Sequence, residues 1–256
     1  MNWKAVGAKS IGSSHIYKNK SCDDSISFAI INSLNTDETL VAIISDGAGS
    51  AKYGGLAARY TTWYFINRLK SILYNGNEIN KNTIYSLLED IYYSLEAKSN
   101  KKSVKLSDFS CTVIGCLLFT DLSILFHIGD GAIVINDGTG AYICNSWPKN
   151  GEYVNTTHFL TDDSNLSNLR IAELDYPINE ISLFTDGLQS LALNFISKTV
   201  HKPFFDSFFP SLRKVTKYAD LLILNRKLKE YLSSSIINEK TDDDKTLLLA
   251  TRIENE

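Results

Sequence analysis

Short apolar runs rich in β-branched residues alternate along this chain with longer segments in which apolar residues recur every three or four positions. The first two runs cover residues 26–31 and 40–44, and a polar cluster at residues 35–38 separates them. Runs of this length with turn-forming residues between them predict two strands joined by a hairpin turn. We therefore expect a sheet to begin at the first of these strands.

Two segments with helical periodicity follow. The first begins after Gly54 and Gly55 and ends at Asn75 and Gly76, and the second covers residues 80–98. Apolar side chains at steps of three and four lie on one face of a helix. The sequence thus predicts two helices, and we expect them to form an antiparallel pair.

Strand-like runs return in the second half of the chain, separated by turns that contain Asp, Gly and Asn. The predicted strands cover residues 111–119, 123–128, 132–136, 141–144 and 181–184. Their succession predicts a β-meander, followed by a helical region at residues 188–233 and a last strand at 246–252. This order favours a single α+β domain over residues 1–256, in which helices cover packed antiparallel sheets.

Composition narrows the function classes. The 256 residues include 26 Lys and Arg against 29 Asp and Glu, and this slightly negative balance argues against nonspecific nucleic-acid binding. No apolar run approaches the roughly 18 residues of a membrane span, and the N-terminus lacks the apolar stretch of a secretion signal. We therefore expect a cytoplasmic protein without a membrane partner.

The scattered cysteines predict buried or incidental thiols rather than a zinc site or disulfides; they are Cys22, Cys111, Cys116 and Cys144.

Four aspartates stand at the ends of predicted strands, and three of them precede a glycine; they are Asp46, Asp130, Asp186 and Asp243. A strand end holds a carboxylate rigidly, and a neighbouring glycine lets a carbonyl or a water approach closely, which suits divalent cations with oxygen ligands. One Asp-Gly pair is an ordinary turn dipeptide. Four such positions along one chain indicate a set of metal ligands.

These aspartates and their neighbours resemble the motifs of the type 2C metal-dependent Ser/Thr protein phosphatases, over essentially the whole chain. The matching residues are Asp24 in Ser21-Cys22-Asp23-Asp24, Asp46-Gly47-Ala48-Gly49, Gly129-Asp130-Gly131, Thr185-Asp186-Gly187 and Asp243-Asp244-Lys245-Thr246. Each motif alone is weak, but five in this order are specific. The segment Gly12-Ser13-Ser14-His15 is most similar to a compact bacterial branch of the family.

The resemblance implies a sandwich of two antiparallel sheets flanked by antiparallel helix pairs, with two Mn²⁺ or Mg²⁺ ions and a possible third at one edge. It implies that Asp46 bridges the two ions, that Asp186 and Asp243 hold the first, and that the Gly47 carbonyl holds the second. Two such ions activate a water for attack on a phosphate and neutralise its charge. These three aspartates are therefore the expected catalytic residues.

The same resemblance assigns Asp130 to a third, weaker ion and Asp24 to waters of the second ion. Two family features are missing. Ala48 stands where eukaryotic members have a histidine, and no arginine precedes Asp24 to bind the phosphate. We select His15 as the substrate ligand in that arginine's place, since an imidazole can donate a hydrogen bond to a phosphate oxygen; the basic residues of this region are Lys9, His15, Lys18 and Lys20.

The implied activity is hydrolysis of phosphoserine and phosphothreonine in a phosphorylated protein, with a cognate Ser/Thr kinase as an expected partner. One alternative is a pseudophosphatase that binds a phosphoprotein or kinase without turnover, and the missing arginine keeps it open. Another is a metal-dependent phosphodiesterase or nuclease, for which the composition offers no basic groove.

Three further groups of residues are given structural interpretations. We expect His127 to be a satisfied core residue and the phenylalanines at 204, 205, 208 and 209 to be buried by packing. Lys52 and Arg59 follow the metal loop and could steer an acidic phosphopeptide, but a solvated helix face is the favoured interpretation.

Overall fold

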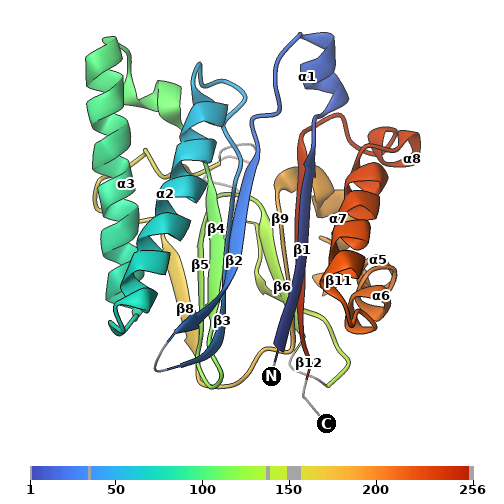
Figure 1. Ribbon diagram of the computed structural model, residues 1–256. Coiled ribbons are helices and arrows are strands. Elements are labelled where there is room, and N and C mark those ends of the chain that lie inside the picture. The colour runs from blue at the N-terminus through green and yellow to red at the C-terminus, as the bar shows by residue number, and fades with distance from the viewer. Residues whose placement is uncertain (1, 34–35, 137–138, 149–156, 254–256) are drawn as a thin grey trace.

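The computed structural model describes residues 2–33, 36–136, 139–148 and 157–253, and its two stacked antiparallel sheets carry helices on both outer faces (Figure 1). Sheet I has the strand order β2-β3-β4-β5-β8, and sheet II has the order β1-β12-β9-β6-β7. Sheet I consists of β2 (Ser25–Ser33), β3 (Thr36–Ser45), β4 (Val113–Leu118), β5 (Ser123–Ile128) and β8 (Arg170–Leu174). Sheet II consists of β1 (Asn2–Ser10), β12 (Lys245–Ile253), β9 (Glu180–Phe184), β6 (Ala132–Asn136) and β7 (Ile143–Ser146). The predicted α+β sandwich of two antiparallel sheets is confirmed.

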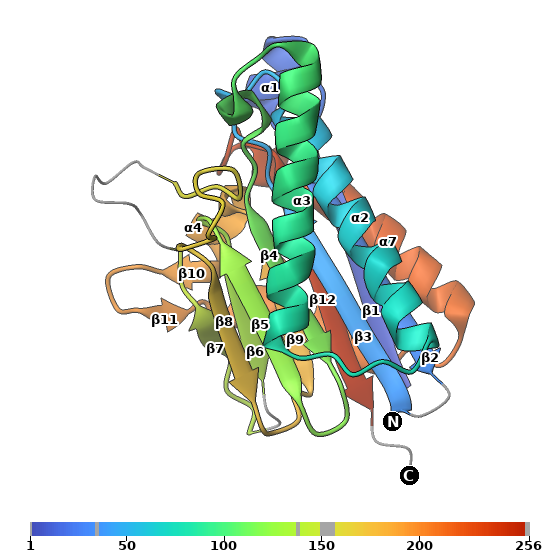
Figure 2. The same ribbon diagram turned by 90° about the vertical axis from the view of Figure 1, so that its left-hand side faces the viewer.

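Long helices cover each sheet. The predicted antiparallel pair is present as α2 (Gly54–Tyr74) and α3 (Lys81–Lys102), which cross the outer face of sheet I (Figure 2). The outer face of sheet II is covered by α7 (Tyr218–Leu232) with the short helices α5 (Lys202–Asp206) and α6 (Phe209–Arg213). The remaining short elements are α1 (Ser13–Tyr17), η1 (Leu106–Phe109), η2 (Asp186–Leu188), α4 (Gln189–Ala192), β10 (Leu193–Asn194), β11 (Thr199–Val200) and α8 (Ser235–Asn238).

Apolar side chains fill three layers: between the sheets, and between each sheet and its helices. Central strands are therefore buried on both faces, and every residue of β4, β5, β6 and β9 is buried. Within β4, Leu117 packs toward the helices while Cys116 packs toward the other sheet. A strand that is buried on both faces needs a continuous apolar run, which is the pattern that made these strands visible in the sequence.

The sheet expected to begin at residue 26 is sheet I, whose edge strand is β2, but the sequence did not predict β1, which precedes it at Asn2–Ser10 and pairs with the C-terminal strand β12 of sheet II. Trp3 and Ala5 face the layer between the sheets, whereas Val6 and Ala8 face α7 and its neighbours. Small residues on both faces, with Lys4 and Lys9 between them, give neither an alternating pattern nor an apolar run. The strand was therefore missed.

The prediction that the strands between residues 111 and 184 form one β-meander is wrong. The consecutive strands β5 and β6 belong to different sheets, so the chain crosses the sandwich between Ile128 and Ala132. Strand β8 then returns to pair with β5. Neither β8 nor the small β10–β11 hairpin was expected, and that hairpin interrupts the predicted helical region at residues 188–233. Turn residues mark where strands end, but they do not specify which sheet the next strand joins.

The observed boundaries of several elements differ from the predicted ones. The predicted strand at 141–144 is instead β7 (Ile143–Ser146), and α3 continues four residues past the predicted end at residue 98. Helix α3 begins where expected because the Asn80 side chain accepts hydrogen bonds from the backbone of Asn82 and Thr83. The predicted hairpin turn at 35–38 falls partly outside the described residues, and its described part lies in β3, which pairs with β2.

Among the smaller groups, the interpretations of His127, of the cysteines and of three of the four phenylalanines are confirmed, whereas Phe208 is only half-buried. Lys52 and Arg59 are both exposed, but Lys52 precedes α2 and does not lie on a helix face. His127 is fully buried, with Nδ1 2.7 Å from Ser146 Oγ and 2.9 Å from an Arg170 nitrogen. The cysteines at 111, 116 and 144 are buried free thiols, Cys22 is half-buried, and the phenylalanines at 204, 205 and 209 are buried beneath sheet II. Across the described ranges, no helix has both the length and the apolar character that crossing a bilayer requires.

Candidate metal centre

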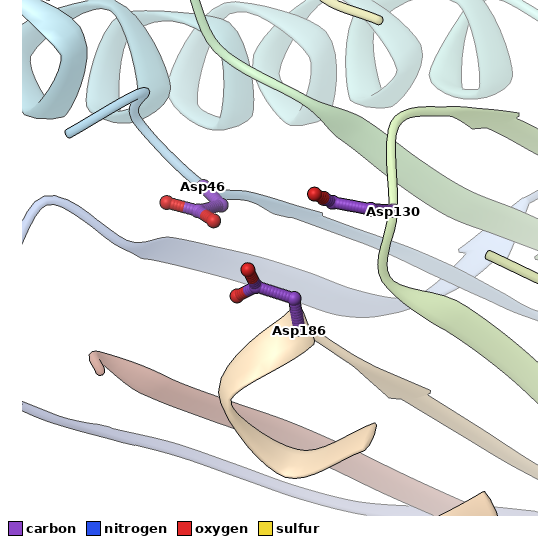
Figure 3. A group of neighbouring side chains, drawn as sticks. All are labelled: Asp46, Asp130 and Asp186. Atoms are coloured by element: carbon purple, nitrogen blue, oxygen red, sulfur yellow. The ribbon is translucent and has the colours of Figure 1, made fainter. Parts of the chain in front are cut away.

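Three carboxylates converge at one end of the sandwich, where strands of both sheets end (Figure 3). Asp46 directly follows β3 of sheet I, Asp186 opens η2 after β9 of sheet II, and Asp130 lies on the crossing from β5 to β6. Each offers an oxygen, and these oxygens lie within 4.8 Å of one another. The fold therefore brings together three of the four aspartates predicted at strand ends, from segments that are far apart in the chain.

The backbone around Asp46 and Asp130 leaves little freedom. Asp46 N donates to Thr112 Oγ1 at 2.9 Å, and Thr112 N donates to Asp46 O at 2.8 Å. Gly129 has a φ of +121°, and an added Cβ would lie 2.6 Å from Thr112 Cβ, so only glycine fits before Asp130. Thr112 on one side and Gly129 on the other thus fix the positions of both carboxylates.

Gly47 is held against the start of α2. An added Cβ at Gly47 would lie 2.2 Å from the carbonyl carbon of Gly54. The Gly47 backbone bridges to Cys111, and Ala48 N donates to Ser110 O at 3.0 Å. The loop after Asp46 is therefore a close-packed turn, and a glycine at position 47 is a steric requirement.

Asp24 is fully buried, and its charge contributes to the raised pKa of both Asp46 and Asp186. Its Oδ2 accepts hydrogen bonds from Thr185 Oγ1 at 2.9 Å and from Thr246 Oγ1 at 2.6 Å. Lys9 Nζ donates to the Asp24 carbonyl oxygen at 2.5 Å. Thr185 and Thr246, which lie in the motifs of Asp186 and Asp243, therefore position Asp24. The sequence analysis did not assign this role to them.

Burial and mutual repulsion oppose ionisation of the cluster. The pKa of Asp46 is raised well above its usual range by burial first, and then by the charges of Asp24, Asp186, Asp130 and Asp243. Burial also raises the pKa of Asp186 well above its usual range, and it raises that of Asp24 to about 7. Buried carboxylates held this close together need positive charge nearby to be ionised at neutral pH.

Two buried oxygens show that a cation would fit. Among the described residues, neither Asp24 Oδ1 nor Asp186 Oδ1 has a hydrogen-bond partner. Buried polar atoms are almost always paired, so an unpaired carboxylate oxygen needs an explanation. Hard divalent cations bind carboxylate and carbonyl oxygens, which are the atoms gathered here. The donor set therefore fits Mg²⁺ or Mn²⁺ better than a softer metal.

A cavity of about 170 Å³ opens over the cluster. Asp243 lines it together with the three clustered aspartates, and its charge contributes to the raised pKa of both Asp46 and Asp186. Thr157 also lines it and donates a hydrogen bond from Oγ1 to Asp130 Oδ2. Five predicted metal ligands, with Gly47 among them, thus share one cavity, whereas Asp24 is not among the residues that line it.

The cavity also receives His15 from α1. Its Nδ1 lies 3.0 Å from Asp244 Oδ2, and Asp244 also accepts the backbone N–H groups of Gly12 at 2.7 Å and Asp23 at 2.5 Å. Asp244 is 2% exposed and was missed by the sequence interpretation, in which it only follows a motif aspartate. It joins α1, the Asp24 loop and the start of β12.

The other basic candidates for phosphate binding lie elsewhere. Lys18 and Lys20 are exposed, and Lys20 Nζ donates to the Gly49 carbonyl at 3.2 Å. Lys9 is engaged by the Asp24 carbonyl, as described above. Ala48, which stands in the place of the eukaryotic histidine, lines the cavity without a titratable group. Of the four basic candidates, His15 is the one that the structure places in the cavity wall.

Comparisons with known proteins find a family model and relatives that match most of this chain. The sequence model of a family described as protein phosphatase 2C matches residues 11–233. Serine/threonine-protein phosphatase 3 of Escherichia coli (strain K12) is 35% identical over 98% of both chains. Among solved structures, serine/threonine phosphatase Stp1 from Staphylococcus aureus has a TM-score of 0.65 and 17% identity, covering 100% of this chain and 96% of its own. The catalytic domain of the phosphatase PstP, in complex with two manganese ions, has a TM-score of 0.63 and 13% identity over 98% and 99% of the two chains.

Proposed function

The chain belongs to the protein phosphatase 2C family, and from that premise we propose that it hydrolyses phosphoserine and phosphothreonine in phosphorylated proteins with the help of Mn²⁺ or Mg²⁺. The observation that carries the proposal is the convergence of Asp46, Asp130 and Asp186 in one cavity, with unpaired carboxylate oxygens buried at the same place. Divalent cations bound there supply an activated water and neutralise the phosphate's charge.

We propose that different residues of the cavity hold different ions. We assign Asp46 to two ions at once, Asp186 and Asp243 to the first, and the Gly47 carbonyl to the second. Asp130 would then hold a third, weaker ion, and Asp24, which Thr185 and Thr246 position, would bind waters of the second ion. Support for this division comes from the shared cavity and from the charge coupling among these carboxylates.

His15 is the residue that we assign to the substrate phosphate. Asp244 holds the ring through Nδ1, and no described residue forms a hydrogen bond with Nε2. A ring fixed in this way can donate one hydrogen bond to a phosphate oxygen, whereas an arginine donates two in a plane. We therefore expect substrate binding that is weaker than an arginine would provide.

The same proposal extends to the setting of the enzyme. We propose that residues 1–256 form a single phosphatase domain of the compact bacterial branch and that it acts in the cytoplasm. A Ser/Thr kinase that phosphorylates the same substrates is its expected signalling counterpart. These statements follow from family membership and from the sequence, and each needs its own experiment.

The decisive experiment measures hydrolysis of p-nitrophenyl phosphate and of a phosphothreonine peptide with Mn²⁺, with Mg²⁺ and with EDTA. We expect turnover with either ion and none with EDTA. Binding of Mn²⁺ and of the phosphopeptide without any hydrolysis would contradict the proposal and would identify a pseudophosphatase instead. A phosphodiester substrate in parallel tests the nuclease alternative, for which we expect no turnover.

A further inference from the structure

Three lysines place their ammonium groups over tyrosine rings where α2 begins and α3 ends. The Tyr53 ring has Lys52 Nζ 5.4 Å and Lys102 Nζ 4.9 Å from its centroid, and the Tyr60 ring has Lys98 Nζ 3.8 Å from its centroid. We call these five residues the lysine–tyrosine strip. Lys98 and Lys102 are one turn apart on α3, so each reaches across to a tyrosine at or near the start of α2.

The strip begins at the edge of the metal cavity. Gly49 and Ser50 line the cavity, and Lys52 follows two residues later. Tyr53 N donates to Asp108 O at 2.7 Å, which joins this loop to the segment that follows α3. In Figure 1 the start of α2 and the end of α3 lie at the same end of the molecule, and β3, which Asp46 follows, also ends there. A peptide whose phosphorylated residue enters the cavity therefore has its neighbouring residues within reach of the strip.

The lysines of the strip have no acidic partner in the protein. Across the parts of the chain that the structure describes, no carboxylate forms an ion pair with Lys52, Lys98 or Lys102. Lys52 and Lys102 are exposed, so their charges are available to a ligand. Lys102 lies in the last turn of α3, where a positive charge stabilises the negative end of the helix dipole. That stabilisation does not require the ammonium group to lie over the Tyr53 ring, so it does not explain the observed contact.

The tyrosine ring also limits the motion of these ammonium groups. Tyr53 stacks on Phe109 with ring centroids 5.0 Å apart, and Phe109 is completely buried. An ammonium group over an aromatic face is attracted to it, so the two lysines are partly ordered before any ligand binds. A lysine that is already ordered loses less side-chain entropy when it forms an ion pair.

We infer that the lysine–tyrosine strip binds an acidic side chain that neighbours the phosphorylated residue in the substrate protein. This inference rests on the proposed phosphatase activity and narrows its substrates to phosphorylation sites with Asp or Glu nearby. Unpaired positive charge beside the cavity attracts an acidic side chain and gives no such attraction to a neutral one, so it favours acidic substrates.

The test compares two phosphothreonine peptides that differ only in carrying Asp or Asn on both sides of the phosphothreonine. For the protein with Mn²⁺ at low ionic strength, we expect kcat/KM about fivefold higher for the Asp peptide, since each exposed ion pair contributes modestly. The preference should shrink at about 0.5 M salt because exposed charges are screened. The double variant Lys52→Gln/Lys102→Gln should lose it, and Lys52→Glu/Lys102→Glu should favour the Asn peptide.

A matched control removes two exposed charges elsewhere. Lys227→Gln/Lys229→Gln on α7 should keep the preference for the Asp peptide, and every variant should keep its activity on p-nitrophenyl phosphate, which has no neighbouring residues. Equal kcat/KM for the two peptides in the unmutated protein would overturn the inference while leaving the phosphatase activity in place. A preference that persists in Lys52→Gln/Lys102→Gln, or that disappears equally in the α7 control, would also overturn it. Failure of the unmutated protein to hydrolyse either peptide or p-nitrophenyl phosphate would instead refute the proposed function, and the inference with it.

Discussion

Asp46 is the carboxylate on which the other acidic groups of the centre converge. It is half-buried, and the charges of Asp24, Asp130, Asp186 and Asp243 all oppose its ionisation. A group in that position benefits most from a bound cation and contributes most to holding one. At the scale of single residues, its removal is therefore the most informative change.

Asp46→Asn should abolish most Mn²⁺ binding and lower turnover by at least about a hundredfold, because an amide carries no charge to hold two cations. The protein should still fold, since the substitution removes one negative charge from a cluster of carboxylates that repel one another. Calorimetric titration with Mn²⁺ and turnover of p-nitrophenyl phosphate at saturating Mn²⁺ measure the two effects. The exposed Asp121→Asn is the control. Turnover within threefold of the unmutated protein would exclude Asp46 as the bridging ligand.

His15→Ala should raise KM for a phosphothreonine peptide about fivefold, because it removes one hydrogen bond to a charged phosphate. Mn²⁺ affinity should not change, since the imidazole is bound to Asp244 and is not among the proposed metal ligands. Steady-state kinetics and calorimetry on the same preparation separate the two quantities. His201→Ala, at an exposed histidine near α5, is the control. An unchanged KM in His15→Ala would leave phosphate binding to the metals or the lysines.

At the scale of elements, the contact between the metal loop and α2 decides whether the loop can keep its shape. Gly47→Ala would place a methyl group 2.2–2.5 Å from backbone atoms of Gly54 and Gly55, so the loop or the helix must shift. We expect a loss of about 1–3 kcal/mol in the free energy of unfolding, together with weaker Mn²⁺ binding.

Gly49→Ala is the matched control in the same loop, because an added Cβ there meets nothing within 4 Å. Its free energy of unfolding should change by less than about 1 kcal/mol and its Mn²⁺ affinity should stay the same. Urea unfolding curves and calorimetry check both variants. Equal effects of the two substitutions would show that close packing at Gly47 is not what shapes the loop.

At the scale of the whole molecule, the acidic centre couples stability to pH and to metal. Without metal, the native pKa of Asp24 is raised to about 7 and those of Asp46 and Asp186 are raised well above their usual range, whereas an unfolded Asp titrates near about 4. Between about pH 4 and 7 the native state thus binds more protons than the unfolded state. Its free energy of unfolding must then fall as pH rises through this range.

We therefore expect the metal-free protein to have a lower Tm at pH 8 than at pH 5.5. Mn²⁺ should raise Tm most at pH 8, because the ionised carboxylates bind it without competition from protons. Thermal unfolding with Mn²⁺ or with EDTA at both pH values measures this, and Asp46→Asn should show a smaller difference with EDTA. A Tm that rises from pH 5.5 to pH 8 without metal would contradict the coupling.

The local pattern of apolar and polar residues determined where many of the helices and strands of this protein lie. Helix α2, the start of α3 at Asn80, and the strands β5 and β6 lie where periodicity and apolar runs predicted them, because backbone geometry and capping depend on near neighbours. The aspartates at strand ends were visible for the same reason. Their order along the chain was enough to indicate a family and a set of candidate metal ligands.

Only the tertiary structure decided which distant residues meet. Asp244 contacts His15 across 229 positions of sequence, and Thr246 holds Asp24 across 222. The place of β1 beside β12 and the crossing between β5 and β6 are likewise settled by burial of two sheets against each other. Such contacts depend on the packing of the whole chain, which no local pattern encodes. The lysine–tyrosine strip is of the same kind, because α2 and α3 bring its residues together only when both pack on sheet I.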